Sequence, residues 1–344
     1  MTFGGKYSMG YRMGYRELRR TGRGWARRSA RRHSRNHGTL ALAMGVVTLC
    51  LLVCVRMAWT DGTARGTERP TATGDFIDEE MLIRELTEVV SSADGEYGVY
   101  VKVINSGETL GIRPEEEFFA GSCYKLPLIL MLYEKAAAGE VDLGDKVAYS
   151  REDREAGTGV IIGYQYGTEF TLRELARLAV VKSDNVAGNM LLRYLGRARF
   201  VEYEKGAGAR VVPETVNNSS PADLGMFAER LLRFCSTNDD LGPELMGHFT
   251  ATEHRDRIPA LLPTSARVAN KIGTWPGFVN DVAIVTDGDI NYVLAVMSKN
   301  VSSVETASRV IAEISLRVYG HVVGRAGASE ANKRSSSGHH QSAG

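Results

Sequence analysis

The sequence predicts an α+β domain: an antiparallel sheet formed from the two ends of the domain, flanked by helices, with an all-helical subdomain inserted between the halves. Strand-like patterns occur near residues 97–112 and again near 268–298, while helical spacing of apolar residues fills the middle. Alternating βα units are not evident, which argues against a parallel sheet. The composition, 43% hydrophobic and 24% charged, is globular and excludes collagen-like, wholly disordered and disulfide-framework proteins.

One transmembrane helix is predicted to precede this domain, at residues 38–59. Thr39–Val55 carries no charge and, at about 1.5 Å per residue, just spans a hydrocarbon core of about 30 Å. Residues 1–37 carry a net charge of +10, which predicts a cytoplasmic N-terminus and an extracytoplasmic domain in a single-pass plasma membrane protein. A cleaved signal peptide is the alternative. Beside a membrane segment, the basic residues favour anionic lipid over nucleic acid as a partner.

The remaining boundaries follow from composition. A linker is expected at 60–75, the folded domain at 76–320 with its helical subdomain at about 121–250, and a disordered polar tail at 321–344. The expected helices are Asp78–Ser91, Ser122–Ala138, Thr171–Val181, Val186–Leu195, Pro221–Phe234 and Ser303–Val318. The expected strands are Tyr97–Ile104, Thr109–Ile112, Val268–Ile272, Phe278–Thr286 and Asn291–Ser298.

A candidate nucleophile begins the helix expected at Ser122–Ala138. Ser122 and Lys125 share a helix face, so the amine lies beneath the hydroxyl. The helix N-terminus also presents the Ser122 amide in a positive field that suits an oxyanion. An amine takes a serine proton only if desolvation or nearby positive charge lowers its pKa. The pair alone is a weak signal, because Ser commonly caps helices and Lys is common within them.

Two further motifs strengthen this prediction. Ser183-Asp184-Asn185 lies in a break between two expected helices, and Lys271-Ile272-Gly273-Thr274 lies on an expected strand. The three motifs in this order are the set found in penicillin-recognising serine enzymes. Over about residues 76–320 the chain resembles the class A β-lactamases and the low-molecular-weight penicillin-binding proteins. The stretches 167–192 and 217–224 extend the resemblance beyond the short motifs.

The resemblance implies a catalytic set. Ser122 would be the acylated nucleophile, Lys125 its base or proton relay, and Ser183 the group that passes a proton to the leaving nitrogen. Class A β-lactamases also use a Glu on a long loop to activate the deacylating water. Glu214 is the candidate here, although most of that loop is missing between it and Pro221. Glu202 and Glu204 fit less well and are expected to be exposed helix charges.

The resemblance also implies a substrate-binding set. Asn185 would bind the amide of the substrate side chain and contact Lys125, while Lys271, Gly273 and Thr274 would line the end that holds the substrate carboxylate. The amides of Ser122 and Thr274 would form the oxyanion hole. Ile272 departs from the family, which usually has a hydroxyl residue there. The lost donor is worth about 1–1.5 kcal/mol, and Thr274 would partly compensate.

Three functions therefore remain open. The first is a membrane-anchored serine hydrolase that opens β-lactam rings through a Ser122 acyl intermediate, with slow deacylation. The second is a D,D-peptidase-like enzyme acting on peptidoglycan stem peptides, and the third is a binding module without turnover. No metal or organic cofactor is expected, because the histidines and cysteines show no ligand spacing. Cys123 and Cys235 are expected to be free thiols.

Overall fold

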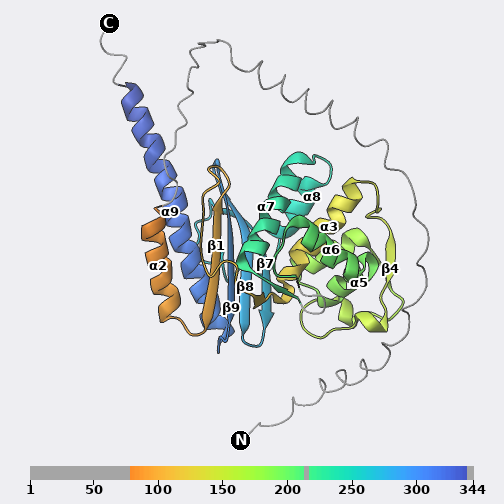
Figure 1. The fold of residues 1–344 in the computed structure, drawn as a ribbon. Coiled ribbons are helices and arrows are strands. Elements are labelled where there is room, and N and C mark those ends of the chain that lie inside the picture. Colours follow the sequence, from red (N-terminus) through yellow and green to blue (C-terminus); the bar gives the residue numbers. More distant parts are fainter. Residues whose placement is uncertain (1–77, 213–216, 339–344) are drawn as a thin grey trace, which may run out of the picture. The chain divides into compact units, whose positions relative to one another are not determined.

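The computed structural model describes residues 78–212 and 217–338. Its main feature is a five-stranded antiparallel sheet in the order β2-β1-β9-β8-β7 (Figure 1). The strands of this sheet are β1 (Glu96–Val103), β2 (Thr109–Ile112), β7 (Arg267–Trp275), β8 (Phe278–Asp287) and β9 (Ile290–Lys299). Two small ladders pair β3 (Phe118–Phe119) with β6 (Asn218–Ser219) and β4 (Lys146–Ala148) with β5 (Glu169–Thr171).

Helices lie on both faces of the sheet, and others form the helical subdomain beside it. The helices of the described residues are α2 (Glu79–Ser92), α3 (Lys125–Ala137), α4 (Leu172–Val181), α5 (Asn185–Leu195), α6 (Arg197–Ala207), α7 (Pro221–Thr237), α8 (Gly242–Thr250) and α9 (Val304–Gly338). Short 3₁₀ turns are η1 (Gly121–Tyr124), η2 (Arg151–Asp153) and η3 (Ile161–Gly163). Figure 1 shows α2 and α9 on one side of the sheet and α7 with the helical subdomain on the other. The predicted α+β organisation is thus confirmed.

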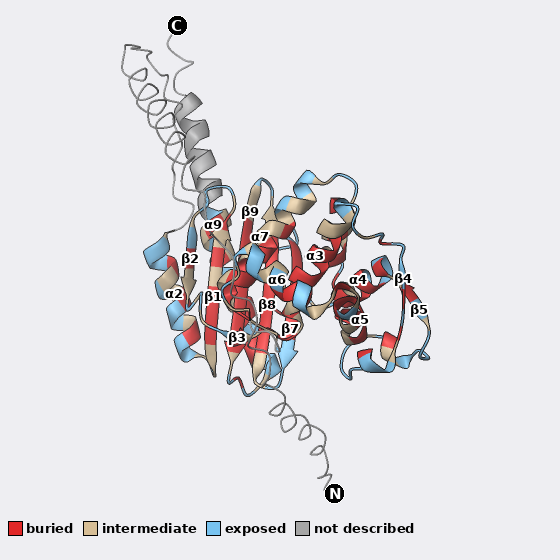
Figure 2. Cartoon of the chain, turned by 45° about the vertical axis from the view of Figure 1, so that its right-hand side comes forward, coloured by how far each residue is buried: buried red, intermediate tan, exposed pale blue. Residues whose placement is uncertain are grey.

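The two ends of the domain meet where β1 pairs with β9, for example at Val99 opposite Val296. Along β9 the side chains alternate between two cores. Leu294 and Val296 face the core under α2 and α9, whereas Ala295 and Met297 face the core under α3 and α7. A strand covered on both faces is apolar throughout, which explains why this run shows little alternation (Figure 2).

Local signals set several helix ends. Thr171 and Glu174 form the capping box that the sequence predicts at the start of α4. Asp78 caps α2, and Ser220 caps α7 with Pro221 in the first turn. Gly288 adopts a φ of 55° in the turn between β8 and β9, a conformation that suits glycine.

Several expectations need correction. Ser122 lies in the 3₁₀ turn η1 rather than in the first turn of an α-helix, and α3 begins at Lys125. Helix α9 continues to Gly338, through most of the tail that was predicted to be disordered at 321–344. The prediction from low complexity missed that this helix runs on from a packed part, in which Val318 and Val322 are fully buried. Helices α6 and α8 were not predicted.

The predicted linker and membrane segment lie outside the described residues. Within the part of the chain that the structure describes, no helix is long and apolar enough to cross a membrane.

A pair of helical glycines tests the packing of α7 on the sheet. A Cβ at Gly225 would come within 2.3 Å of the Tyr100 ring on β1, whereas a Cβ at Gly247 in α8 would meet nothing within 4 Å. We expect Gly225→Ala to lower the free energy of unfolding by about 1–3 kcal/mol through overpacking. Gly247→Ala should instead raise it by about 0.5–1 kcal/mol. Urea denaturation of both variants checks this, and equal effects would contradict the packing described.

Candidate active site

The turn that carries Ser122 is packed against the edge strand β7. The Cys123 thiol donates to the Lys271 carbonyl oxygen at 3.2 Å. The close approach requires Gly273, because a Cβ there would lie 2.1 Å from the Ala120 carbonyl oxygen. Gly121, with a φ of 54°, turns the chain into η1. Strand β7 therefore fixes the position of the serine that follows Gly121.

Lys125 is fully buried beside this turn. Its Nζ donates to the Ser183 carbonyl oxygen at 2.8 Å and to Asn185 Oδ1 at 3.0 Å. Burial, followed by the positive charge of Lys271, holds the pKa of Lys125 well below its usual range. A neutral amine has two N–H donors and one lone pair. Since the two N–H groups have acceptors here, the lone pair is left to accept a proton.

Ser183 connects the helical subdomain to the sheet. Lys271 Nζ donates to its hydroxyl at 2.8 Å, while Lys125 and the Thr158 hydroxyl donate to its carbonyl oxygen. Ser183 has a φ of 52°, an uncommon conformation for a residue with a side chain. Contacts from both sides of the site thus hold this strained backbone in place.

Asp184 stabilises the turn between α4 and α5 that contains Ser183. Its buried carboxylate accepts hydrogen bonds from the Val160, Ile161 and Ala187 amides at 2.6, 2.9 and 3.0 Å. It therefore caps α5 and also ties the segment around Gly159 to it, where a Cβ would clash with the Asp184 carboxylate.

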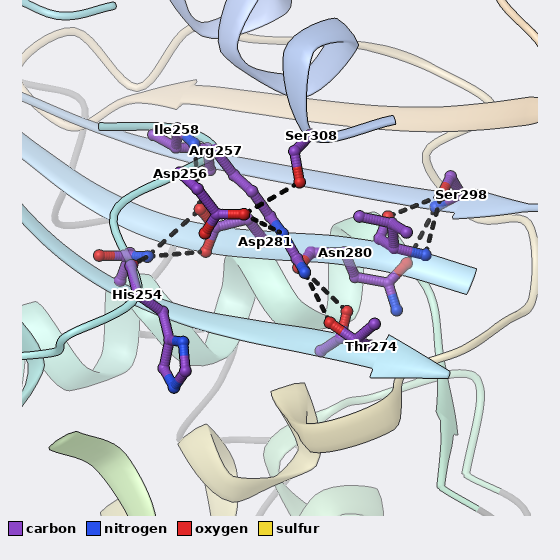
Figure 3. Close-up of polar contacts among 12 residues, drawn as sticks. His254, Asp256, Arg257, Ile258, Thr274, Asn280, Asp281, Ser298 and Ser308 are labelled. Carbon is purple, nitrogen blue, oxygen red and sulfur yellow. Dashed lines mark hydrogen bonds and ion pairs between the residues drawn. The ribbon is translucent and has the colours of Figure 1, made fainter. Parts of the chain in front are cut away.

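A buried arginine, Arg257, stabilises the end of the site near Thr274 (Figure 3). Arg257 is only 2% exposed and donates to the Gly273 and Asn280 carbonyl oxygens at 2.9 and 2.5 Å. It also donates to the Thr274 hydroxyl at 2.5 Å. Because that hydroxyl oxygen accepts from Arg257, its proton is free to point at a substrate carboxylate. Arg257 thus orients Thr274, the residue expected to replace the hydroxyl donor that is missing at Ile272.

Lys271 is fully buried, and burial lowers its pKa to about 8. Its Nζ also donates to the Ile272 carbonyl oxygen at 2.8 Å. Behind it, Asp281 accepts from Asn270 and from the Ile258 amide. Burial raises the pKa of Asp281 to about 6 despite these partners.

A cavity of about 230 Å³ opens over Ser122. It lies between the β7 edge and the segment before α5. Its lining includes Ser122, Ser183, Asn185, Ile272 and Thr274, together with Phe119, Gly121, Tyr124, Glu155, Ala156, Gly157, Thr158, Asn189, Asn217 and Trp275. A small substrate can reach the hydroxyls of both serines in it.

The structure brings together the predicted site residues Ser122, Lys125, Ser183, Asn185, Lys271, Gly273 and Thr274. Glu214 lies outside the described residues. Glu204 is half-buried, contrary to expectation, and lines a small void together with Tyr124. Burial raises its pKa to about 7. It does not line the cavity over Ser122.

Sequence reasoning missed Arg257, Trp275 and Glu155. Arg257 belongs to no motif and stands in the run His254-Arg255-Asp256-Arg257, which resembles any charged loop. Only its burial against β7 distinguishes it. The predicted free thiols are confirmed for Cys123 and Cys235, and burial raises the pKa of Cys123 to about 12, which makes it unreactive.

These features define a serine hydrolase of the acyl-transfer class: a serine on the cavity three residues before a desolvated lysine, a second serine that bridges two lysines, and buried cations at the end that would hold a carboxylate. The chain matches the Beta-lactamase enzyme family over residues 81–322. A β-lactamase of Bacillus amyloliquefaciens is 29% identical over 228 residues, which cover 60% of this chain and 72% of that protein.

Solved structures agree. A variant of the last common ancestor of Gram-negative class A β-lactamases is 26% identical, with a TM-score of 0.64, over 71% of this chain and 99% of that one. A mutant of the protein PBP-A, solved as an acyl-enzyme complex with penicillin G, shares the fold at 23% identity and a TM-score of 0.65, over 70% and 95% of the two chains. The chain belongs to the β-lactamase enzyme family and is a serine hydrolase of β-lactam amide bonds.

The contact between Gly273 and Ala120 gives a test of the site. We expect Gly273→Ala to displace the turn that carries Ser122 and to lower β-lactam hydrolysis by about 100-fold, because a misplacement of about 1 Å costs that much. Nitrocefin hydrolysis measures it. Gly163→Ala is the control, since a Cβ there meets nothing within 4 Å. Equal activity of the two variants would show that the turn tolerates displacement.

Proposed function

We propose that the protein is a class A-type acyl-enzyme hydrolase in which Ser122 opens the β-lactam ring and is then deacylated slowly. The observation that carries this proposal is the pairing of Lys125. Both N–H groups of its neutral amine have acceptors, on Ser183 and Asn185, so its lone pair is available for the Ser122 proton. The low pKa of Lys125 supports the neutral form.

The reaction follows from this arrangement. Lys125 takes the proton of Ser122 Oγ, which attacks the lactam carbonyl carbon. The C–N bond then breaks, and the nitrogen takes a proton through the Ser183 hydroxyl, whose oxygen accepts from Lys271. The Ser122 and Thr274 amides would stabilise the oxyanion. Lys271, Gly273 and Thr274 would hold the substrate carboxylate, with Arg257 behind them.

Deacylation is the step that the sequence supports least. The segment between α6 and β6, which carries Glu214, is short compared with the loop that the family uses. We therefore propose that hydrolysis of the acyl-enzyme is slower than its formation. Water would attack the ester carbon, lose a proton to a base such as Glu214, and release Ser122 with its proton restored.

Intact-mass spectrometry over time, on the full chain mixed with penicillin G, tests this function. We expect an adduct of one penicillin on the wild type that decays slowly, and none on Ser122→Ala. A permanent adduct would favour a penicillin-binding protein that acts on stem peptides. No adduct at any time would overturn the acyl-enzyme mechanism and favour a binding module.

Acylation should follow a bell-shaped pH profile. Neutral Lys125 is needed as the base, so the rate rises as pH passes the lowered pKa of Lys125. Cationic Lys271 is needed for the carboxylate, so the rate falls as pH passes about 8, where Lys271 loses its proton. Lys271→Arg should move the alkaline limb upward, because arginine stays charged. Stopped-flow acylation rates measure both limbs, and an unmoved alkaline limb would remove Lys271 from this role.

We further propose that residues 38–59 anchor the protein in the plasma membrane, with the hydrolase domain on the extracytoplasmic side. The uncharged run of Thr39–Val55 behind a basic segment supports this. The full chain should sediment with membranes after carbonate washing. Recovery of a shortened chain in the soluble fraction would favour the cleaved signal peptide.

A further inference from the structure

Glu155 places a negative charge in the wall of the cavity over Ser122. Among the residues that line this cavity and that the structure describes, it alone carries a charged side chain. The cations of the site, Lys125, Lys271 and Arg257, lie behind the wall instead and are buried. A substrate in the cavity therefore meets the carboxylate of Glu155 directly.

The carboxylate is held in position. Asn189 Nδ2 donates to Glu155 Oε2 at 2.8 Å and to the Asp153 carbonyl oxygen at 3.2 Å. Asp153 is itself fixed by Arg193 at 2.8 Å and by Ser150. Within residues 78–212 and 217–338, no basic side chain lies within ion-pair distance of Glu155. Its charge is thus oriented but not neutralised by a partner.

The neighbouring backbone shows which part of a substrate Glu155 would face. The Ala156 carbonyl oxygen accepts from Asn185 Nδ2 at 3.1 Å, so Glu155 is one residue from the group that holds Asn185. In the proposed function, Asn185 binds the amide of the acyl side chain. A side chain that continues beyond that amide would then pass Glu155, and the substrate carboxylate would lie at the opposite end, near Lys271. Burial and Lys271 lower the pKa of Lys125, and the charge of Glu155 opposes this lowering in part, so Glu155 lies within electrostatic reach of the catalytic end.

We propose that Glu155 is a specificity-determining residue that selects substrates whose acyl side chain carries an alkylammonium group. This inference rests on the proposed function, because it assigns the substrate class of the same site. An ammonium group there gains attraction from an unpaired carboxylate in a cleft, and a carboxylate group is repelled. The cavity is then negative at Glu155 and positive near Lys271. It favours substrates with an ammonium group at the first end and a carboxylate at the second.

Three penicillins that share one nucleus test this on the full chain. The side chain bears an ammonium in ampicillin, no charge in penicillin G and a carboxylate in carbenicillin. At about pH 6.5 an α-amino group is charged, and we expect second-order acylation rates in the order ampicillin, penicillin G, carbenicillin. Glu155→Gln should lower the ratio of ampicillin to penicillin G by about five- to tenfold, and Glu155→Lys should favour carbenicillin over ampicillin.

The matched control is Glu152→Gln. Glu152 lies on the same segment and is exposed, but it faces Arg193 and does not line the cavity. The ratio of ampicillin to penicillin G acylation in Glu152→Gln should equal that of the wild type.

A second pair of ligands distinguishes a β-lactam from a peptide as the source of the ammonium group. Both ligands are stem-type peptides that end in D-Ala-D-Ala and compete with penicillin G for Ser122. The lysine side chain is free in one peptide and acetylated in the other.

Stronger competition by the free amine, in the wild type and not in Glu155→Gln, would support a peptide source; discrimination among the penicillins alone would support a β-lactam source. Acylation of the wild type with ratios that Glu155→Gln leaves unchanged would overturn the inference and leave the proposed function intact. No acylation by any penicillin would overturn both.

Discussion

Two buried lysines that share Ser183 are the constraint on which the site depends. Lys125 donates to its carbonyl oxygen and Lys271 to its hydroxyl, so amines from α3 and β7 meet at one residue of the α4–α5 turn. Burying an amine is costly unless fixed acceptors surround it, and the charge of Lys271 also lowers the pKa of Lys125. The helical subdomain and the sheet must therefore be held together accurately.

The rest of the structure serves this requirement. Asp184 fixes the turn by accepting three amide hydrogen bonds, which offsets the strain of the positive φ at Ser183. Gly273 permits the close contact between β7 and the nucleophile turn. Asn280 adds a further link, since its side chain donates to the Phe119 carbonyl oxygen at 2.9 Å and accepts from the Ser298 amide. These contacts join the sheet to the segment that leads into Ser122.

Much of the fold could be predicted because its signals are local. The capping box at Thr171 and the turn at Gly288 depend on a few neighbouring residues, and the apolar runs of β8 and β9 are long. The prediction failed where local signals were weak. Helix α6 buries only Phe200 and Val201, and α8 is short, so neither has a clear apolar period. Helix α9 extends past its buried part, into a polar, low-complexity segment with no apolar period to mark it.

The sequence by itself determined the three motifs, their order and most of the helices and strands around them, because covalent neighbours and periodicity are written in it. The 3₁₀ turn at Ser122 was the exception. Only the tertiary structure decided which other groups join them. Arg257 and Glu155 have no distinctive neighbours in sequence, yet the fold places one behind Thr274 and the other in the cavity wall. It also lowered the pKa values of Lys125 and Lys271, because desolvation depends on groups that are distant in sequence and meet only when the chain folds.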